Sequence, residues 1–419
     1  MKSGSAFRGC AIALLPLFLL AGCGDPEAGS STFTQVDSAG VTIVESTRPL
    51  WRGREGWKVA PDPQLSIGLT DGDERYLLND VRGVRRMSDG RIAVLDRGSF
   101  RVRVYDSTGA HLMDLGGEGD GPSEFRTPQF MGLISDTLFV YEAIGGMLTW
   151  FSPDGRFLRV SQGFGQADRS RGTFAMLGNV GERIGIGVRY GAPGYHVLDT
   201  GINREPWSIW RFDLENWSLD SLASVPGGEV EIVSSDGRGT LQRRYVFGKW
   251  TCLATSNDRV FVAPNDQFSI REYDEEGALR RIIRRADAPR QVSRSDFNRW
   301  VDRTIEMGDA DRHEQAGMRR TASQLKVAET MPAFRSLSVD SEGNLWLEEW
   351  EDVGLEQGRF SVFRPDGAWL GYVEIPEGLT AGSGWSDTRM LEIGSDYILG
   401  VWADDYGVEQ VRLYGIEKQ

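Results

Sequence analysis

Six short apolar runs are spread along the chain, and each is followed by polar residues. Most of these residues at the run ends carry side-chain oxygens. Carboxylate and amide oxygens are the ligands that Ca²⁺ prefers, and that ion takes six to eight of them. The same groups can instead receive a cationic or polar ligand, or they can be turn residues. The positions are Asp96 and Arg97; Glu142; Arg189 and Tyr190; Asn265 and Asp266; Glu349, Glu351 and Asp352; and Asp404 and Asp405.

These residues form no recognisable metal signature in the sequence, so the metal site stays undefined and Ca²⁺ is only one of three interpretations. No set of side chains with the spacing of a nucleophile and its base can be named, and no catalytic residue is assigned. What the residues can do together depends on whether the fold brings the six run ends to one face.

A repeat supplies that fold. Residues 81–117 contain four short stretches with the alternation of β-strands, separated by turns such as "SDG" and "STG". Related units follow at 130–163, 252–283 and 389–416, with two longer units between them. Six four-stranded units of ~35–55 residues predict an all-β, six-bladed β-propeller.

The last hairpin of the unit is its best-defined part. "VYDSTGAHL", "WFSPDGRFL", "EYDEEGALR" and "VFRPDGAWL" each contain an aromatic residue, a turn ending in glycine and an apolar return. Glycine there predicts a positive φ, which tight hairpins require.

The sixth unit stops after three strands, so an N-terminal strand is expected to complete it and close the ring. Two segments qualify, "VTIVES" at 41–46 and "QLSIGL" at 64–69, and the sequence does not decide between them.

"GGEGDGPSEF" (116–125) lies between the first and second units. A phosphate-binding loop would continue with Gly-Lys-Ser/Thr into a helix, and an EF-hand loop would need a fixed acidic spacing ending in Glu. Neither pattern is present. We expect a connection from the outer to the inner strand, with Phe125 available to pack between blades.

This stretch, with the later "DTLFVYE" and "SPDG", resembles NHL-type six-bladed propellers, most closely bacterial lipoproteins that carry Gly-x-Gly-Pro-x-Glu-Phe between the first two blades. The resemblance implies a fold and no activity. Lactonase-like propellers hold Ca²⁺ at the axis. Zinc-dependent lyases of the NHL fold need several axial histidines, and none of His111, His196 and His313 falls on an expected innermost strand.

Residues 289–330 interrupt the β pattern. Ser293 or Ser295 can cap a helix, after which Phe297, Trp300 and Val301 follow at helical spacing. A second helix is expected at about 311–328. The segment is either a packed decoration or a lid or docking element over the channel mouth, where Trp300 with Arg299 and Arg303 would act.

The first 22 residues have the form of a secretory signal, with Lys2 and Arg8 before an apolar run. Leu-Ala-Gly-Cys at 20–23 resembles a lipobox, which implies cleavage before Cys23 and its acylation. Residues 23–31 would be a tether and 32–419 the propeller. Because Gly24, not Asp, follows Cys23, the outer membrane is the expected address, facing the periplasm or the surface.

Lys and Arg number 47 against 61 Asp and Glu, a formal net charge of −14, which argues against nucleic acid as a partner. We therefore expect a membrane-anchored exported module that binds a protein, peptide or glycan without catalysis. The ligand face would hold Asp96, Arg97, Glu142, Arg189, Tyr190, Asn265, Asp266, Glu349, Asp404 and Trp300. The alternative is a metal-dependent lactonase- or lyase-like enzyme with a divalent cation at the axis.

Overall fold

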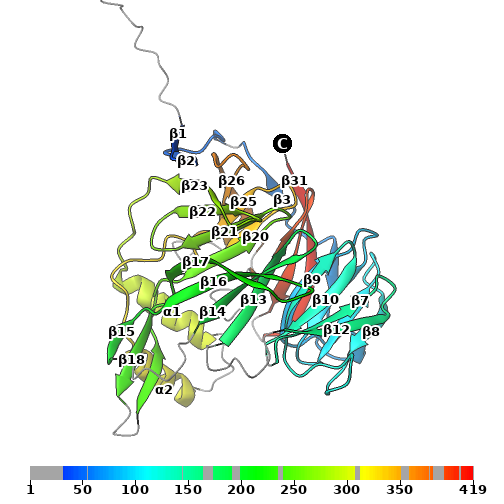
Figure 1. The fold of residues 1–419 in the computed structure, drawn as a ribbon. Coiled ribbons are helices and arrows are strands. Elements are labelled where there is room, and N and C mark those ends of the chain that lie inside the picture. The colour runs from blue at the N-terminus through cyan, green and yellow to red at the C-terminus, as the bar shows by residue number, and fades with distance from the viewer. Residues whose placement is uncertain are drawn as a thin grey trace, which may run out of the picture. The chain divides into compact units, whose positions relative to one another are not determined.

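The computed structural model is nearly all-β, with two α-helices among the residues it describes (Figure 1). The expected signal and tether, residues 1–31, lie outside the described part of the chain. The described residues are 32–53, 55–143, 145–163, 173–190, 199–234, 239–306, 312–350, 358–376, 378–380, 391–404 and 407–418.

Five antiparallel sheets in chain order have the strand-by-strand hairpin connectivity that the repeat predicts. Each contains four consecutive strands of the repeat, a pattern typical of a β-propeller. Their strands are β5 (Val81–Arg86), β6 (Ile92–Asp96), β7 (Arg101–Tyr105) and β8 (His111–Gly116); β9 (Pro128–Ile134), β10 (Thr137–Glu142), β11 (Met147–Phe151) and β12 (Phe157–Gln162); β13 (Thr173–Val180), β14 (Ile184–Tyr190), β16 (Pro206–Asp213) and β17 (Leu219–Pro226); β20 (Thr251–Thr255), β21 (Arg259–Pro264), β22 (Ser269–Asp274) and β23 (Leu279–Arg285); and β24 (Leu337–Val339), β25 (Leu345–Glu348), β26 (Gly358–Phe363) and β27 (Trp369–Ile375).

A further sheet joins the two ends of the described chain. The N-terminal β4 pairs antiparallel with the C-terminal β31, with Ile67 opposite Val411, and β3 pairs with the end of the same strand. Of the two candidate segments, the one at 64–69 therefore supplies the strand. The members are β28 (Leu379–Thr380), β29 (Glu392–Ile393), β30 (Tyr397–Ala403), β31 (Glu409–Glu417), β3 (Lys58–Val59) and β4 (Leu65–Ile67).

The other candidate, at 41–46, takes a different place. The hairpin β1 (Phe33–Ser38) and β2 (Val41–Ser46) extends the fourth sheet, because β2 pairs in parallel with β23. Its last residue, Ser46, lies opposite Arg285. The expectation that this segment could complete the C-terminal sheet is wrong, since its apolar alternation fits the free edge of β23 equally well.

The glycines of the four final hairpins have the predicted conformation. Gly109, Gly155, Gly277 and Gly367 have φ between 84° and 93°. A side chain is strained at such angles, so glycine ends each turn and fixes the register of the strand that follows.

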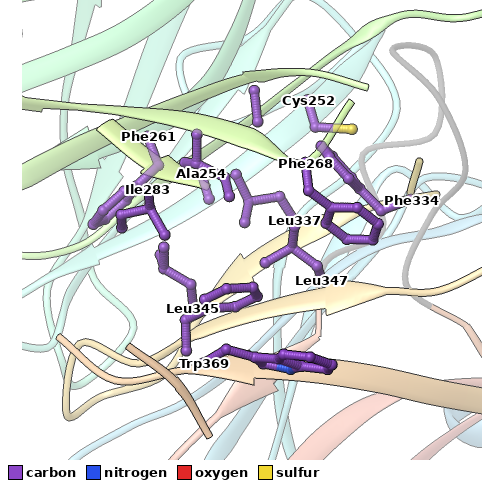
Figure 2. Close-up of a cluster of buried hydrophobic side chains, with 13 residues drawn as sticks. Cys252, Ala254, Phe261, Phe268, Ile283, Phe334, Leu337, Leu345, Leu347 and Trp369 are labelled. Carbon is purple, nitrogen blue, oxygen red and sulfur yellow. The ribbon is translucent and has the colours of Figure 1, made fainter. Parts of the chain in front are cut away.

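Apolar side chains fill the spaces between successive sheets. Figure 2 shows the cluster between the fourth and fifth sheets, where Phe268 and Ile283 meet Phe334, Leu345 and Trp369. Equivalent clusters lie between each of the other neighbouring pairs, including the sixth and first sheets, where Val401 and Val411 pack with Val84 and Ile92. Burial of the alternate strand residues is therefore the main force that holds sheet to sheet.

The glycine-rich stretch 116–125 is a connection, as expected. Phe125 is fully buried between the first and second sheets, in a cluster with Leu115 and Phe151. Gly116 has φ 90°, and a Cβ there would lie 2.2 Å from the Phe125 ring. Glycine is required because the ring occupies the space of a side chain.

The insertion between β23 and β24 forms α1 (Arg294–Glu306) and α2 (Arg312–Ala322), so the second helix is shorter than predicted. Ser293 caps α1 reciprocally with Asp296. The Ser293 hydroxyl accepts the Asp296 N–H at 3.2 Å, and the Asp296 carboxylate accepts the Ser293 N–H at 2.8 Å. This is a capping box with Asp in the acidic position.

A small sheet that the sequence did not predict lies beside the helices in the chain's green region (Figure 1). It consists of β15 (Gly201–Asn203), β18 (Val230–Ser234) and β19 (Thr240–Arg244), in that order. The chain leaving β19 bridges to the chain leaving α2, with Val246 opposite Val327. No helix among the described residues is long and apolar enough to cross a membrane.

Candidate functional site

The six run ends fall, as expected, at the end of the second strand of each sheet or just after it. Most of their described side chains, however, are engaged inside the fold, although the buried Nε of Arg189 makes no hydrogen bond to the described residues. Asp96 is 0% exposed and accepts hydrogen bonds from the Asn79 N–H (3.2 Å), the Ser99 hydroxyl (2.7 Å) and the Arg103 Nε (3.1 Å). Arg103 in turn donates to the Glu74 carbonyl at 2.6 Å.

Glu142 and Asn265 repeat this arrangement in the second and fourth sheets. One oxygen of Glu142, which is 1% exposed, accepts the N–H groups of Arg126 (2.7 Å) and Thr127 (3.0 Å), just before β9. Asn265, 0% exposed, accepts the Trp250 N–H at 2.8 Å and donates to the Phe334 carbonyl at 3.0 Å. These side chains fasten the chain as it enters the first strand.

Glu349 belongs to a buried ion pair between the fourth and fifth sheets. Its carboxylate receives both terminal nitrogens of Arg285, at 2.6 and 3.2 Å, and the Ser361 hydroxyl at 2.5 Å. The Arg285 guanidinium lies 3.5 Å from the centre of the Phe268 ring and 4.6 Å from that of Trp369. Burial alone would lower the pKa of Arg285, but the Glu349 carboxylate outweighs it and raises that pKa.

The remaining ring residues are also paired. Arg97 and Arg82 share Asp80, with closest distances of 2.5 and 2.8 Å. Asp266 takes a two-pronged pair from Arg204, at 2.6 and 2.8 Å, which holds its pKa below the usual value despite burial.

Asp404 accepts the Val408 N–H at 2.8 Å. The Arg189 guanidinium lies 5.5 Å from the Trp210 ring centre. Tyr190 ends β14, and its side chain lies outside the described part of the structure, as do residues Glu351, Asp352 and Asp405.

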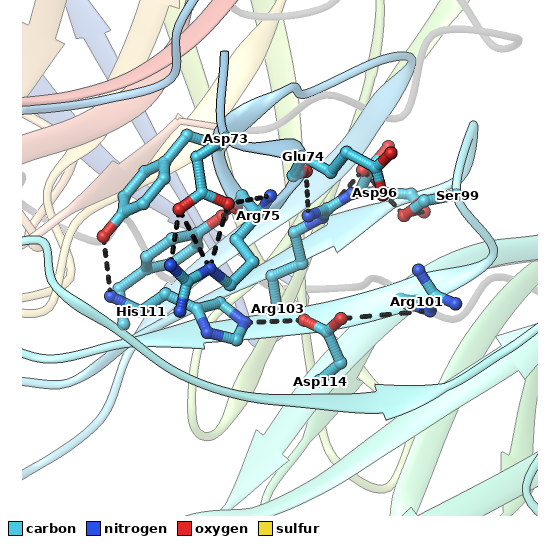
Figure 3. Close-up of polar contacts among 11 residues, drawn as sticks. Asp73, Glu74, Arg75, Asp96, Ser99, Arg101, Arg103, His111 and Asp114 are labelled. Carbon is cyan, nitrogen blue, oxygen red and sulfur yellow. Dashed lines mark hydrogen bonds and ion pairs between the residues drawn. The ribbon is translucent and has the colours of Figure 1, made fainter.

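A polar network on the first sheet binds its outer strands to the 3₁₀ turn η1 (Glu74–Tyr76) (Figure 3). The His111 ring contacts Asp114 at 2.7 Å through Nε2, and the backbone N–H of His111 donates to the Tyr76 hydroxyl at 3.0 Å. Hydrogen bonds from Arg75 lower the pKa of Asp73 to about 2. This network includes Asp96 through Arg103, so it too serves to hold the sheet.

Within the described residues, no group of three or more His, Cys, Asp or Glu side chains is placed to hold a metal ion. Cys252 is buried beside Trp250, and burial raises the pKa of its thiol to about 12.

A second polar region is built differently. We call it the insert cluster: Val246, Phe247, Ala328 and Met331 form its core, and Tyr245, Phe297, Trp300, Leu325 and Trp350 pack around them. It joins the end of β19, helix α1, the segment after α2 and the end of the second strand of the fifth sheet.

Two arginines lie over the two indoles of this cluster. The Arg244 guanidinium is 5.3 Å from the Trp300 ring centre, and the Arg335 guanidinium is 5.3 Å from that of Trp350. Phe297 stacks on Trp300 with ring centroids 6.1 Å apart, while Phe247 and Trp250 meet Trp350 edge-on. The rings are therefore occupied by cations and by one another.

The cluster contains buried donors without acceptors. The Trp350 Nε1 and the Arg335 Nε make no hydrogen bond in the part of the chain that the structure describes. Arg335 uses one Nη on Glu348 at 3.0 Å, whereas no ion pair of Arg244 is found among the described residues. Partial burial and the like charge of Arg335 lower the pKa of Arg244.

Of the predicted ligand-face residues only Trp300 lies in this cluster, together with Phe297 of the same predicted helix. Arg299 is held by Asp296 at 2.7 Å, and the side chain of Arg303 is outside the described part. Arg244, Arg335 and Trp350 were missed. The segment 243–250, "RRYVFGKW", gave a signal, because it combines three cations with three aromatic residues and contains no carboxylate.

No known family profile and no curated protein matches this sequence. Solved structures do. A DUF4221 member from Bacteroides vulgatus has TM-score 0.50 at 10% identity, covering 88% of this chain and 100% of its own. A Bacteroides fragilis protein classed as exported has TM-score 0.47 at 10% identity, covering 90% and 99%. A Xanthomonas campestris gluconolactonase has TM-score 0.36 at 12% identity, covering 88% and 99%. At these identities the likeness to the DUF4221 member concerns the fold alone.

Proposed function

We propose that this chain is an exported, lipid-anchored β-propeller that binds a protein, peptide or glycan ligand through its insert cluster and does no chemistry on it. The observation that carries the proposal is the contrast in hydrogen bonding. The carboxylates and the amide at the strand ends are satisfied by their own chain, whereas the insert cluster brings together two buried donors without acceptors in the described part of the chain, the Trp350 Nε1 and the Arg335 Nε. A similar pair, the Arg189 Nε and the Trp210 Nε1, lies in the third sheet. Unsatisfied buried donors are costly, and a ligand that accepts from them removes that cost.

The propeller would have six blades and be closed. In support, the first strands contact one another in the order β5, β9, β13, β20, β24 and β29, and β29 contacts β5. The pairing of β4 with β31 joins the chain ends within the sixth sheet. The NHL-type resemblance of residues 116–125 is consistent with this arrangement.

The anchor would be the acylated Cys23, and the membrane the outer one. Substituting Cys23→Ala should move the protein from the membrane fraction to the soluble periplasmic fraction. Retention of the variant in the membrane fraction would contradict the anchor.

The binding role is tested on the detergent-solubilised full-length protein, by photo-crosslinking in a cell-envelope preparation. Wild type and Trp300→Ala are compared with a control truncation, Phe157→Ala, at an exposed aromatic residue on the distant β12. One envelope component should crosslink to wild type and to the control and be lost from Trp300→Ala. Equal crosslinking by all three proteins would refute the insert cluster as the binding site.

The alternative is a lactonase- or lyase-like enzyme with a divalent cation at the axis. Calcium stabilises a protein that binds it by mass action, so a thermal-melting titration decides. The binding proposal predicts an unchanged midpoint at millimolar calcium and no hydrolysis of simple lactones. A calcium-dependent rise in the midpoint together with turnover would favour the enzyme.

A further inference from the structure

Arg244 has no ion pair among the described residues, and it is set apart by its place over the Trp300 ring in the insert cluster. The carboxylates on this side of the small sheet have other partners: Glu229 accepts the Lys249 N–H at 2.8 Å, and Glu348 pairs with Arg335 at 3.0 Å. Glu231 pairs with Lys326 at 3.2 Å through Oε1, while its buried Oε2 accepts no hydrogen bond from the described residues. Arg335, in the same cluster, is near enough for its like charge to lower the pKa of Arg244. Like charges at short range repel unless an anion lies between them.

Each guanidinium group lies over an indole ring, 5.3 Å from the ring centre, and this position leaves N–H groups for an anion. An arginine over an aromatic face uses the flat side of its guanidinium, so the N–H groups in the plane remain available. Two N–H groups in that plane match the two oxygens of a carboxylate or phosphate. The indole N–H of Trp350 and the Nε of Arg335 are two further buried donors without an acceptor among the described residues, and a bound anion could accept from both.

The indole faces of Trp300 and Trp350 are already covered by other side chains, and this limits which ligands can bind there. Arg244 and Phe297 both lie against Trp300, and Arg335 lies over Trp350. A sugar ring that needed a free indole face would have to displace one of these groups. An extended peptide needs none, and the edge strand β19, which ends at Arg244 and is mostly exposed, offers a backbone for it to pair with.

We propose that Arg244 and Arg335 form an oxyanion-binding site that receives a side-chain carboxylate of an acidic, extended peptide segment. The inference rests on the proposed binding function and specifies its ligand. Arg244 supplies the unpaired charge, and Arg335 and Trp350 supply the additional donors.

The test is isothermal titration calorimetry of the full-length protein with hexaglutamate, and separately with hexaglutamine, inorganic phosphate and glucuronate. Hexaglutamate should bind, and hexaglutamine should not. Arg244→Gln should weaken binding by at least about tenfold, the effect expected for loss of a charge-assisted pair. Arg244→Lys, which retains the charge without the fork, should fall between wild type and Arg244→Gln.

The matched control is Arg156→Gln, which removes the same charge from an exposed pair with Asp154 on the second sheet. It should bind hexaglutamate as wild type does. Circular dichroism and the melting midpoint establish that each variant is folded. The site is refuted if Arg244→Gln and Arg156→Gln bind alike, or if neither hexaglutamate nor the small anions bind.

Binding of phosphate or glucuronate without hexaglutamate would overturn the peptide assignment. Failure of all four probes, while Trp300→Ala still loses its crosslinked component, would overturn the oxyanion site and leave the proposed binding function standing. If Arg244→Gln still binds hexaglutamate as wild type does and Trp300→Ala still crosslinks to the envelope component, both the oxyanion site and the proposed binding function are wrong.

Discussion

The acceptor side chains at the strand ends and the donor side chains of the insert cluster differ in how they are satisfied. Glu142 and Asn265 are buried. Glu142 accepts two backbone N–H groups and Asn265 accepts one, all from the chain just before the first strand of the same sheet. In the insert cluster, Trp350 and Arg335 bury N–H groups without an acceptor, and Arg244 has no carboxylate partner among the described residues. A ring of acidic residues in a sequence therefore does not by itself mark a ligand site, because the backbone competes for the same oxygens.

The comparison has an energetic consequence. Groups that are satisfied inside the fold should be expensive to remove and irrelevant to binding, whereas groups left unsatisfied should be inexpensive to remove and important for binding. Substitutions in the two regions can separate these effects.

The largest loss of stability is expected from Arg285→Ala. It leaves the Glu349 carboxylate buried without its cation, at a cost of about 3–5 kcal/mol in unfolding free energy. Chemical denaturation measures it. The double variant Arg285→Met with Glu349→Leu, which removes both charges, should recover much of the loss. If the single variant costs under about 1 kcal/mol, the ion pair does not hold the fourth and fifth sheets together.

Glu142→Ala should come next. It strips the acceptor from two backbone N–H groups in front of β9, and each unsatisfied buried donor costs about 1–3 kcal/mol. Glu142→Gln keeps an acceptor oxygen and should lose clearly less, and this variant is the control in the same denaturation experiment. Equal losses of stability in Glu142→Ala and Glu142→Gln would mean that the position contributes through its charge and not through the two hydrogen bonds.

Asp296→Asn tests the cap of α1 through pH. Burial alone would raise the pKa of Asp296, but hydrogen bonds from Ser293 and Arg290 outweigh it and lower the pKa from 3.8 to about 2. The ionised carboxylate therefore stabilises the fold above about pH 4, by about 2 kcal/mol, and this contribution is lost as pH falls through about 2. The difference in stability between wild type and Asp296→Asn should shrink over that window. A difference independent of pH would contradict the cap.

The smallest effect on stability is expected from Arg244→Gln, within about 0.5 kcal/mol of wild type, since the side chain has no ion pair among the described residues and repels Arg335. The same denaturation experiment measures it. A loss above about 1 kcal/mol would show that Arg244 stabilises the fold, like the residues that are satisfied at the strand ends.

Local patterns predicted much of the fold. The hairpin glycines, the buried Phe125 and the capped start of α1 all depend on residues close together in sequence. The parallel docking of β2 on β23 and the sheet that contains β15 depend on partners far apart in the chain, which periodicity does not report. For the same reason, the positions of the run ends were predictable, but their hydrogen-bond partners were not.

The insert cluster shows the same limit. Trp300 was found because it lies on a predicted helix, yet its neighbours Arg244 and Trp350 lie on segments some fifty residues away on either side. The charge pattern of residues 243–250 could have pointed to Arg244, and it became informative once the structure showed which residues surround it; no local pattern marked Trp350.

The most direct test of the contrast between the two regions is to locate a bound oxyanion in a crystal of the full-length protein soaked in selenate, using the anomalous scattering of selenium. The account predicts a peak within hydrogen-bond distance of the Arg244 and Arg335 guanidinium groups. A peak at the strand ends beside Asp96, Glu142 or Asn265, or none near Arg244 because a carboxylate of the same chain pairs with it, would contradict the account.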